Sequence, residues 1–336
     1  MAATLLRRLT VASAMLVVLA GLLVGATAAP AAADPEGGTK TLRNALESAA
    51  RGYSTAKIKL DASRKRQAAL QTSVKQSQTN AAALEGRVTQ IAIRSYQYGR
   101  FSAINLLLNS TSPDSFLERA ARLDTLAQTD GHALADYRTA IDTGTAAKTA
   151  IDAEIKEQEK QLTVLARKKR EAELALAASG GGGASGGFLS ANSPLAKPAP
   201  RNSDGSWPKE SCTVDDPTTS GCITPRLLNA YRQARVAGFT HYTSCYSRRN
   251  SGEHPKGRAC DFAANAKTFK NAAATGSDKA YGDRLAAYFV KNADRLGVMY
   301  VIWYRQIWLP GSEWRRYSAS GGPAAVHTNH VHLSVL

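Results

Sequence analysis

A seven-residue repeat of apolar positions runs through residues 40–96 and is the strongest constraint on how this chain can fold. Its two seams carry apolar side chains at twelve of sixteen positions over eight heptads. A heptad pattern of this length predicts a coiled coil, although many small or polar seam positions predict weak packing. The seams hold Leu42, Ala49, Ala56, Ser63, Leu70, Ser77, Leu84 and Ile91, and Leu46, Tyr53, Leu60, Gln67, Val74, Ala81, Val88 and Ser95.

A second helical stretch, from about residue 134 to 176, keeps an apolar register. Between the two stretches, residues 96–123 contain an apolar segment in which Asp114 or Ser115 can cap a short helix that begins near Phe116. Two long helices joined in this way predict an all-α antiparallel coiled-coil hairpin. The apolar segment is either the cap of that hairpin or a surface that recruits a partner.

The N-terminus has the order of a secretory signal peptide. Arg7 and Arg8 precede an apolar run from Val11 to about Val24, and three alanines end at Ala33. This order predicts cleavage near Ala33 and a secreted or cell-wall associated protein. A retained membrane anchor is the alternative, but the apolar run is short for a span of about 20 residues.

Glycine and proline mark the domain boundaries. Residues 179–187 are rich in glycine and serine, which predicts a flexible linker, and residues 193–200 are rich in proline, which predicts a stiffer, extended segment. The expected organisation is a signal peptide at 1–33, a coiled-coil domain at 34–178, a linker at 179–204 and a C-terminal domain at 205–336.

The C-terminal domain has mixed α and β patterns. Residues 226–236 and 283–296 have helical periods, and the apolar run 298–304 predicts a buried strand that continues through residues 306–308. Trp303 and Trp308 are expected mainly in the core, with substrate contact as the alternative.

The charge of the chain points to an anionic partner. Lys and Arg number 43 and Asp and Glu 27, which gives a formal net charge of +16. The sequence lacks a basic stripe with interleaved aromatic residues, so nucleic acid is not the expected partner. An anionic cell-wall polymer or membrane surface fits an exported chain better.

Four of the six histidines lie in two short stretches of the C-terminal domain. His254 and Asp261 are in the first, and His327, His330 and His332 are in the second. Two histidines and a carboxylate are an established ligand set for catalytic zinc, so we expect zinc on His254, Asp261 and His332. On a strand, His330 and His332 point to one face, which lets His330 act beside the metal. Solvated histidines near a mobile C-terminus are the alternative.

All four cysteines also lie beyond the linker. An even number in an exported chain predicts two disulfides, for which three connectivities are possible. We expect Cys212–Cys222 and Cys245–Cys260, because the second bridge would tie an arginine pair to the segment that holds Asp261.

The string Ser-Gly-Glu-His-Pro-Lys-Gly-Arg-Ala-Cys-Asp-Phe at 251–262 resembles the SxHxxGxAxDF pattern of VanY-type D-alanyl-D-alanine carboxypeptidases. The tail His-x-x-His-x-His is similar to that of the penicillin-insensitive murein endopeptidases. Both belong to the LAS zinc metallopeptidases, which share the Hedgehog fold. The resemblance covers residues 205–336 and implies a small α+β domain with a mainly antiparallel sheet.

The resemblance also implies roles for single residues. His254, Asp261 and His332 would hold zinc, and Arg248 or Arg249 would face the developing oxyanion. The carboxypeptidases place a glutamate three residues before the last ligand, where this chain has Asn329. Proton transfer would then fall to His330, with His327 orienting it, or catalysis would be absent.

The apolar segment of the helical region carries a resemblance of its own. Its Y-x-x-G … LL-x-S-x-S-x-x-x-F-L-x-R pattern is similar to the coiled-coil domains of secreted cell-wall hydrolases that a division complex of FtsE–FtsX type recruits. The partners implied are peptidoglycan and such a membrane complex.

Together these features predict an exported zinc-dependent peptidoglycan peptidase that cleaves stem peptides or cross-links. Its coiled coil would position the catalytic domain or gate it, because a tethered domain can fold back on the helices. The alternative function is a non-catalytic protein that binds peptidoglycan or regulates a hydrolase, with a degenerate peptidase domain.

Overall fold

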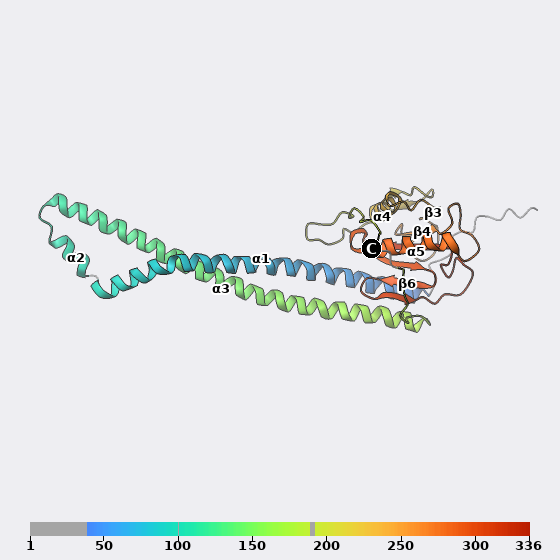
Figure 1. The fold of residues 1–336 in the computed structure, drawn as a ribbon, viewed down its shortest axis with the longest axis horizontal. Coiled ribbons are helices and arrows are strands. Elements are labelled where there is room, and N and C mark those ends of the chain that lie inside the picture. The colour runs from blue at the N-terminus through green and yellow to red at the C-terminus, as the bar shows by residue number, and fades with distance from the viewer. Residues whose placement is uncertain (1–38, 100, 189–191) are drawn as a thin grey trace, which may run out of the picture.

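A computed structural model describes residues 39–99, 101–188 and 192–336. The expected signal peptide therefore lies outside the described residues. The N-terminal half is helical, with α1 (Lys40–Tyr98), the short α2 (Phe101–Leu108) and α3 (Pro113–Ala178). Figure 1 shows α1 and α3 as a long arm with α2 at its far end and the C-terminal domain at the other. None of the described helices is both long and apolar enough to cross a membrane.

The start of α3 differs from the sequence prediction. Ser112, not Asp114 or Ser115, is the N-cap: its side chain accepts a hydrogen bond from the N–H of Ser115, whose hydroxyl in turn accepts from the N–H of Ser112. Pro113 suits the first helical position, where no N–H is needed. The short helix expected near Phe116 is therefore the beginning of a single helix of 66 residues.

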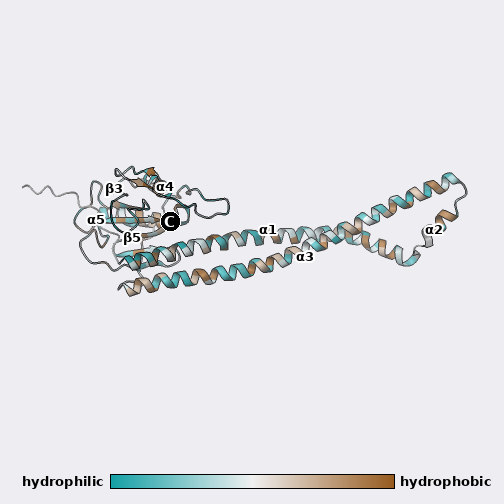
Figure 2. Cartoon of the chain, turned by 180° about the vertical axis from the view of Figure 1, so that it is seen from behind, coloured by the Kyte–Doolittle hydropathy of each residue, from teal (hydrophilic) through white to brown (hydrophobic). Residues whose placement is uncertain are grey.

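The two long helices run in opposite directions and contact each other through small and polar groups. Ser63 donates a hydrogen bond to the carbonyl of Glu154, and Arg66 forms an ion pair with the same residue. Further along, Arg94 pairs with Asp130. Figure 2 shows hydrophilic and hydrophobic residues interspersed along both helices of this arm, in keeping with the mixed seam positions. The supercoiled packing of a coiled coil remains a prediction.

The glycine-rich segment after α3 is not a free linker. The N–H of Gly182 donates to the carbonyl of Arg316, the N–H of Arg316 donates to Gly183, and Ala184 forms a bridge with Arg315. The segment extends the edge of the C-terminal sheet, because absent side chains let its backbone approach the edge strand closely.

The proline-rich segment also lies on the domain. The N–H of Ala196 donates to the side chain of Asn292, and the N–H of Ala199 donates to the carbonyl of Arg295. Both alanines are buried. The glycine-rich segment is thus hydrogen-bonded to the domain and not a free linker. Residues 193–200 are neither helix nor strand, and their extended form remains a prediction.

The C-terminal domain is a small α+β unit with an antiparallel six-stranded sheet. Its helices are α4 (Pro225–Val236), α5 (Gly276–Lys291) and α6 (Ala293–Leu296). The strand order is β3-β4-β8-β5-β6-β7. The strands are β3 (Thr243–Ser244), β4 (Ala259–Ala263), β5 (Val298–Trp303), β6 (Gln306–Leu309), β7 (Glu313–Arg316) and β8 (His330–Val335), with a separate pair β1 (Val214–Asp215) and β2 (Cys222–Ile223).

Two predicted elements of this domain differ from the structure. The helix expected at 283–296 begins at Gly276 and is interrupted at Asn292. The strand expected to continue through residues 306–308 instead turns back as β6, paired antiparallel with β5. Tyr304 and Arg305, with φ values of 49° and 62°, form a tight turn of the kind that joins hairpin strands.

Each face of the sheet is covered by different elements. On one face, Val331 and Leu333 of β8 join a core with α4 and α5. On the other face, Tyr300 and Ile302 of β5 join a second core that includes Leu42 and Leu46 of α1 and the end of α3. Because side chains alternate along a strand, His330 and His332 point to the face covered by α1.

Candidate metal centre

The pairing of β4 with β8 builds the centre. Asp261 on β4 lies directly opposite His332 on β8, and Ala263 lies opposite His330. Directly paired residues share a face, so Asp261, His332 and His330 point the same way. His254 reaches them from the loop before β4. His254 Nε2 lies 3.2 Å from Asp261 Oδ2, and His332 Nδ1 lies 2.8 Å from Asp261 Oδ1.

Ligand atoms of His254, Asp261 and His332 all lie within 4.8 Å of one another. The structure thus brings together the three residues predicted as metal ligands. All three are buried, with exposed fractions of 3%, 0% and 1%. Two imidazoles and a carboxylate in this arrangement can hold a metal ion.

Outer contacts set which ring nitrogen of each histidine faces the centre. The His254 Nδ1–H donates to the carbonyl oxygen of Cys245, which directs its Nε2 toward Asp261. On His332, Nε2 lies 2.8 Å from the hydroxyl oxygen of Ser334, and Nδ1 faces Asp261. Metal-binding histidines commonly have such a partner on the second nitrogen, which fixes the tautomer and the ring orientation.

Asp261 is ionised despite complete burial. Burial alone would raise the pKa of its carboxyl group, but the positive charges of protonated His254 and His330 and the hydrogen bond with His332 hold the pKa well below its ordinary value. A buried carboxylate among histidines supplies the negative charge that a cation needs.

Asn329 holds His330 in a definite orientation. Its amide nitrogen donates to the carbonyl of Lys270 at 2.7 Å, so its amide oxygen faces His330 Nδ1 at 2.8 Å and accepts from it. The proton of a neutral His330 therefore sits on Nδ1. Its Nε2 carries the lone pair and lies 3.4 Å from Asp261 Oδ1. Asn329 cannot act as a base itself, but it leaves His330 able to accept a proton.

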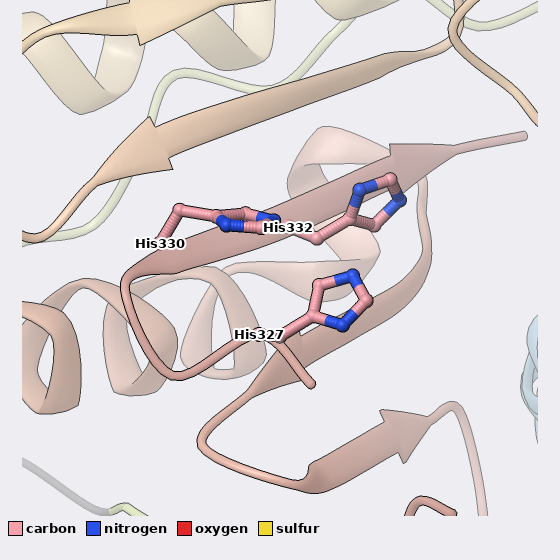
Figure 3. A group of neighbouring side chains, drawn as sticks. All are labelled: His327, His330 and His332. Carbon is pink, nitrogen blue, oxygen red and sulfur yellow. The ribbon is translucent and has the colours of Figure 1, made fainter. Parts of the chain in front are cut away.

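No hydrogen bond within the described residues joins the ring of His327 to His330, so the expected role of His327 in orienting His330 stays a prediction. The two rings lie 4.8 Å apart, but neither nitrogen of His327 makes a hydrogen bond within the described part of the chain. The backbone of His327 is in the left-handed region, with φ of 53°. Figure 3 shows its ring reaching toward His330 and His332 from the turn before β8.

The structure distinguishes the two candidate arginines. Arg248 is exposed, whereas Arg249 is partly buried and its charge helps to lower the pKa of His330. Arg249 Nη1 is buried and has no hydrogen-bond partner among the described residues. Arg249 is therefore the arginine that can act at this centre.

The helix α1 covers the face on which the centre lies. The ring of Tyr300 stacks on His332 with centroids 5.7 Å apart, and the ring of Tyr317 meets His327 edge-on at 5.9 Å. Leu42 and Leu46 of α1 belong to the same packed cluster as these tyrosines. The centre is closed to solvent on this side.

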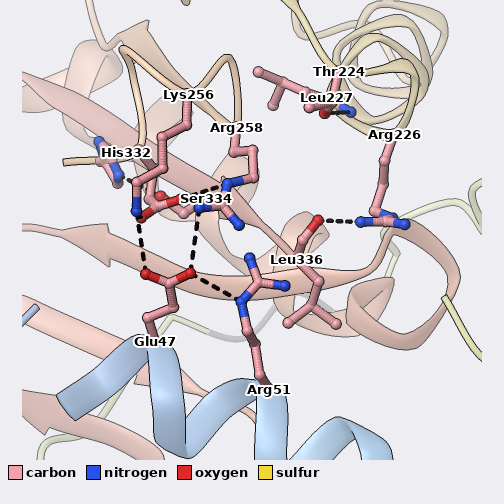
Figure 4. Close-up of polar contacts among 11 residues, drawn as sticks. Glu47, Arg51, Thr224, Arg226, Leu227, Lys256, Arg258, His332, Ser334 and Leu336 are labelled. Carbon is pink, nitrogen blue, oxygen red and sulfur yellow. Dashed lines mark hydrogen bonds and ion pairs between the residues drawn. The ribbon is translucent and has the colours of Figure 1, made fainter. Parts of the chain in front are cut away.

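An ion-pair network fixes α1 to the loop that carries His254. The carboxylate of Glu47 on α1 lies 3.2 Å from Lys256 Nζ and 3.2 Å from Arg258 Nη2 of the loop (Figure 4). Within α1, it also lies 2.9 Å from Arg51 Nε. Burial alone would raise the pKa of Glu47, but Arg51 and Lys256 hold it below its ordinary value. Lys256 and Arg258 lie between His254 and Asp261 in sequence, so α1 braces the segment that joins two candidate ligands.

The two disulfides join Cys212 to Cys222 and Cys245 to Cys260. Cys245 offers the carbonyl that accepts from His254, and Cys260 precedes Asp261. The second bridge therefore links the partner of one candidate ligand to the neighbour of another.

Removing this bridge should weaken metal binding. We expect Cys245→Ser/Cys260→Ser to lower metal affinity at least about tenfold, because an outer contact of a ligand is lost, and to lower stability by about 2–4 kcal/mol. Cys212→Ser/Cys222→Ser is the matched control, with a similar loss of stability and unchanged affinity. Competition with a chelating dye measures affinity; equal affinities of the two variants would contradict the prediction. The oxidised chain should show no free thiols.

The pKa of His330 gives the stability a pH dependence. Burial lowers this pKa from 6.5 to about 4, against the attraction of Asp261. Between these values the unfolded chain binds more protons than the folded chain. The contribution of His330 to the free energy of unfolding, up to about 3 kcal/mol, is therefore complete above pH 6.5 and lost as the pH falls toward 4.

Urea unfolding of chelator-treated protein between pH 4 and pH 8 measures this effect. Wild type should lose stability on acidification more steeply than His330→Gln, whose side chain does not titrate. Parallel curves for the two proteins would show that His330 is not the titrating group.

Sequence reasoning missed three contributors to the centre. Ser334 lies two residues after His332 on the same strand face, so the alternation could have revealed it. The carbonyl of Cys245 is a backbone group, and Glu47 lies more than 200 residues from the loop it contacts. No local pattern in the sequence indicates either of them.

The fold and the centre together define a small α+β domain with a potential metal site, carried by a long helical arm. The family described as "VldE, C-terminal domain" matches residues 219–328, about a third of the chain. The matched region includes His254, Asp261 and His327 and ends before His330. No curated protein and no solved structure gives a significant match.

Proposed function

We propose that this protein is an exported zinc-dependent peptidase that cleaves stem peptides or cross-links of peptidoglycan, with a helical arm that positions or gates the catalytic domain. The observation that carries the proposal is the meeting of His254, Asp261 and His332, with ligand atoms within 4.8 Å of one another. Support also comes from the resemblance of residues 205–336 to the LAS metallopeptidases.

Zinc suits this ligand set. A catalytic zinc ion commonly has three protein ligands from histidine and carboxylate, and the fourth position is left for water or substrate. When bound, zinc polarises the scissile carbonyl and lowers the pKa of a water molecule toward about 7. Asp261 lowers the net charge of the centre, and the contacts of His254 and His332 with Cys245 and Ser334 hold their donor nitrogens in place.

Two further residues have separate roles, one in proton transfer and the other in stabilising negative charge. His330 accepts a proton at Nε2, because Asn329 holds the ring proton on Nδ1. Arg249 stabilises the negative charge that develops on the scissile carbonyl oxygen. The asparagine at the position of the usual glutamate thus assists the base.

The rest of the chain supports the proposed substrate and place of action. The net charge of +16 favours an anionic polymer. Two disulfides and the predicted signal peptide fit an oxidising compartment outside the cytoplasm.

The far end of the helical arm exposes large apolar side chains. This exposure fits recruitment by a membrane complex of FtsE–FtsX type, as the resemblance of this segment implies. The side chains are Ile104, Leu106, Leu108, Phe116 and Leu117.

Gating is supported by the burial of the centre beneath α1. A peptidase must admit a peptide to its metal, and in this structure Tyr300, Tyr317 and α1 cover the histidines. Movement of α1 away from the loop at 251–258 would open that face. The helices are thus both the support of the domain and its cover.

The test is digestion of purified peptidoglycan by the mature chain, with muropeptides separated and identified by mass spectrometry. Loss of a terminal D-alanine identifies a carboxypeptidase, and conversion of cross-linked dimers to monomers identifies an endopeptidase. Dipicolinate should stop the reaction, and zinc should restore it. Glu47→Lys loosens the contact of α1 with the loop at 251–258. An unchanged muropeptide profile with both zinc-loaded wild type and zinc-loaded Glu47→Lys would refute the proposal.

A non-catalytic role is the second candidate. It is favoured by Asn329, which stands where the carboxypeptidases have a glutamate, and by the complete burial of the centre. Such a protein would bind peptidoglycan or regulate another hydrolase. Sedimentation with insoluble peptidoglycan, together with an unchanged muropeptide profile, would identify this role.

A further inference from the structure

The imidazole of His327 is buried, and its two nitrogens lie outside the hydrogen bonds of the described residues. It is fully buried, and neither ring nitrogen has a hydrogen-bond partner within residues 39–99, 101–188 and 192–336. Burying polar atoms without partners costs free energy, and each such case in a folded protein calls for an explanation.

The backbone holds His327 in this position. Its φ of 53° is uncommon for a residue other than glycine. Hydrogen bonds on both sides fix the turn: the His327 N–H donates to Ala324, and its carbonyl accepts from Tyr304 at 2.8 Å. Backbone strain that is maintained in this way is common at ligand sites. Burial, strain and two unpartnered nitrogens together indicate a residue placed to bind something.

The neighbours of His327 are two further imidazoles. Its ring centroid lies 4.8 Å from that of His330 and 5.6 Å from that of His332 (Figure 3). Nitrogen atoms of the three rings all lie within 4.8 Å of one another. His330 Nε2 is also buried without a hydrogen-bond partner in the described part of the chain. These three histidines form a second possible ligand set, which overlaps the set of His254, Asp261 and His332 only at His332.

We propose that His327, His330 and His332 form a second metal-binding set, so that the cluster offers one divalent ion two alternative positions. Three imidazoles favour a transition-metal ion such as zinc, cobalt, nickel or copper over magnesium or calcium, which prefer oxygen ligands. Because His332 is shared, the two positions exclude each other. An ion in the second position also engages His330.

The inference rests on the proposed function only in taking the first set to be a metal site. An ion in the second position would leave no free His330 to accept a proton, so this position would be a resting one. Its test measures metal binding and coordination rather than hydrolysis, so its failure is distinguishable from failure of the proposed peptidase activity.

The test uses the full mature chain, stripped of metal and titrated with Co²⁺ while its visible absorption is recorded. His254→Ala removes a ligand of the first set alone. His327→Asn removes a ligand of the second set alone, and asparagine tolerates the left-handed backbone of this turn. His132→Asn, at an exposed histidine on α3, is the matched control and should behave as wild type.

We expect His254→Ala to keep a weaker cobalt site with an altered spectrum. Adding His327→Asn to this variant should weaken the remaining binding more than about 100-fold, because loss of a direct ligand exceeds the effect of losing an outer contact. His327→Asn alone should bind one Co²⁺ through the first set. Equal cobalt binding by His254→Ala and the double variant would overturn the proposal.

A second measurement does not depend on the double variant. Cu²⁺ favours nitrogen ligands, so its paramagnetic resonance spectrum in the wild-type chain should show coupling to three imidazole nitrogens. The spectrum of His327→Asn should show coupling to two. The same nitrogen count in both proteins would exclude His327 as a ligand.

Discussion

The His254→Ala variant of the full chain should retain less than about a tenth of the zinc that wild type holds, and it should release no product from peptidoglycan. Removing one of three direct ligands weakens binding by more than about 100-fold, so a weak competing chelator strips the ion. We expect about one zinc per wild-type chain by elemental analysis under non-chelating conditions.

The fold should survive this substitution, because the domain keeps both disulfides and both cores of the sheet. Near-ultraviolet circular dichroism and a thiol count of zero would verify this. His132→Ala, an exposed histidine on α3, is the matched control and should keep both zinc and activity. Wild-type protein without stoichiometric metal under non-chelating conditions, or a His254→Ala protein that keeps a full complement of zinc against the weak chelator, would show that the first ligand set is assigned wrongly.

Reversing the charge of Glu47 should loosen the cover over the centre. Glu47→Lys removes contacts with Arg51, Lys256 and Arg258 and places a positive charge beside them. Only the pairs with Lys256 and Arg258 join α1 to the loop, because Arg51 lies on α1 itself. Partly exposed ion pairs contribute about 0.5 kcal/mol each, so the loss is about 1 kcal/mol and the open population rises about fivefold. Gating then predicts hydrolysis about five times faster than that of wild type, and faster removal of zinc by a chelator.

Glu85→Lys is the control for this experiment, since it makes the same charge change at an exposed position on the same helix. It should behave as wild type. The full chain is preferable to an isolated C-terminal domain, because removal of α1 exposes the apolar face that includes Tyr300 and Ile302. If Glu47→Lys hydrolyses peptidoglycan at the wild-type rate while releasing zinc faster, the helices are a support or a recruiter and not a gate.

Recruitment and gating would use opposite ends of the helical arm. The exposed apolar side chains lie near α2, whereas Glu47 and Leu46 lie at the end that covers the metal centre. A partner bound at the far end could act on the cover only through the helices. Because small and polar groups pack weakly between α1 and α3, moving one helix against the other would need little free energy.

Local patterns in the sequence determined the elements that depend on periodicity. The heptads of residues 40–96 indicated a long helix, because apolar side chains that recur every 3.5 residues on average form one face of a helix. This period can be recognised without knowing what packs against that face. The spacing of His330 and His332 indicated a strand with both imidazoles on one face, as β8 has. The residues predicted as metal ligands and the cysteine pairs chosen from the sequence are the groups that the structure brings together.

Tertiary contacts decided what periodicity could not. The glycine-rich segment forms a sheet edge because the edge of β7 offers unpaired backbone groups, and nothing in its own residues signals that edge. The apolar run after Val298 turns back at Tyr304 and Arg305. Both residues have positive φ, which residues other than glycine disfavour, because the tight turn that joins β5 to β6 requires it.

What the sequence by itself determined is therefore the type of each long element and the kind of ligand that the histidine-rich segments can supply. Only the tertiary structure decided that Asn329 orients His330 and that Glu47 braces the loop of His254. It also decided that the ring of His327 lies beside the candidate ligands, with neither ring nitrogen hydrogen-bonded within the described residues. The physical reason is range. Helical and strand periods are set by neighbours a few residues apart, whereas the centre is assembled from β4, β8, two loops and α1, whose approach depends on burying the two faces of one sheet.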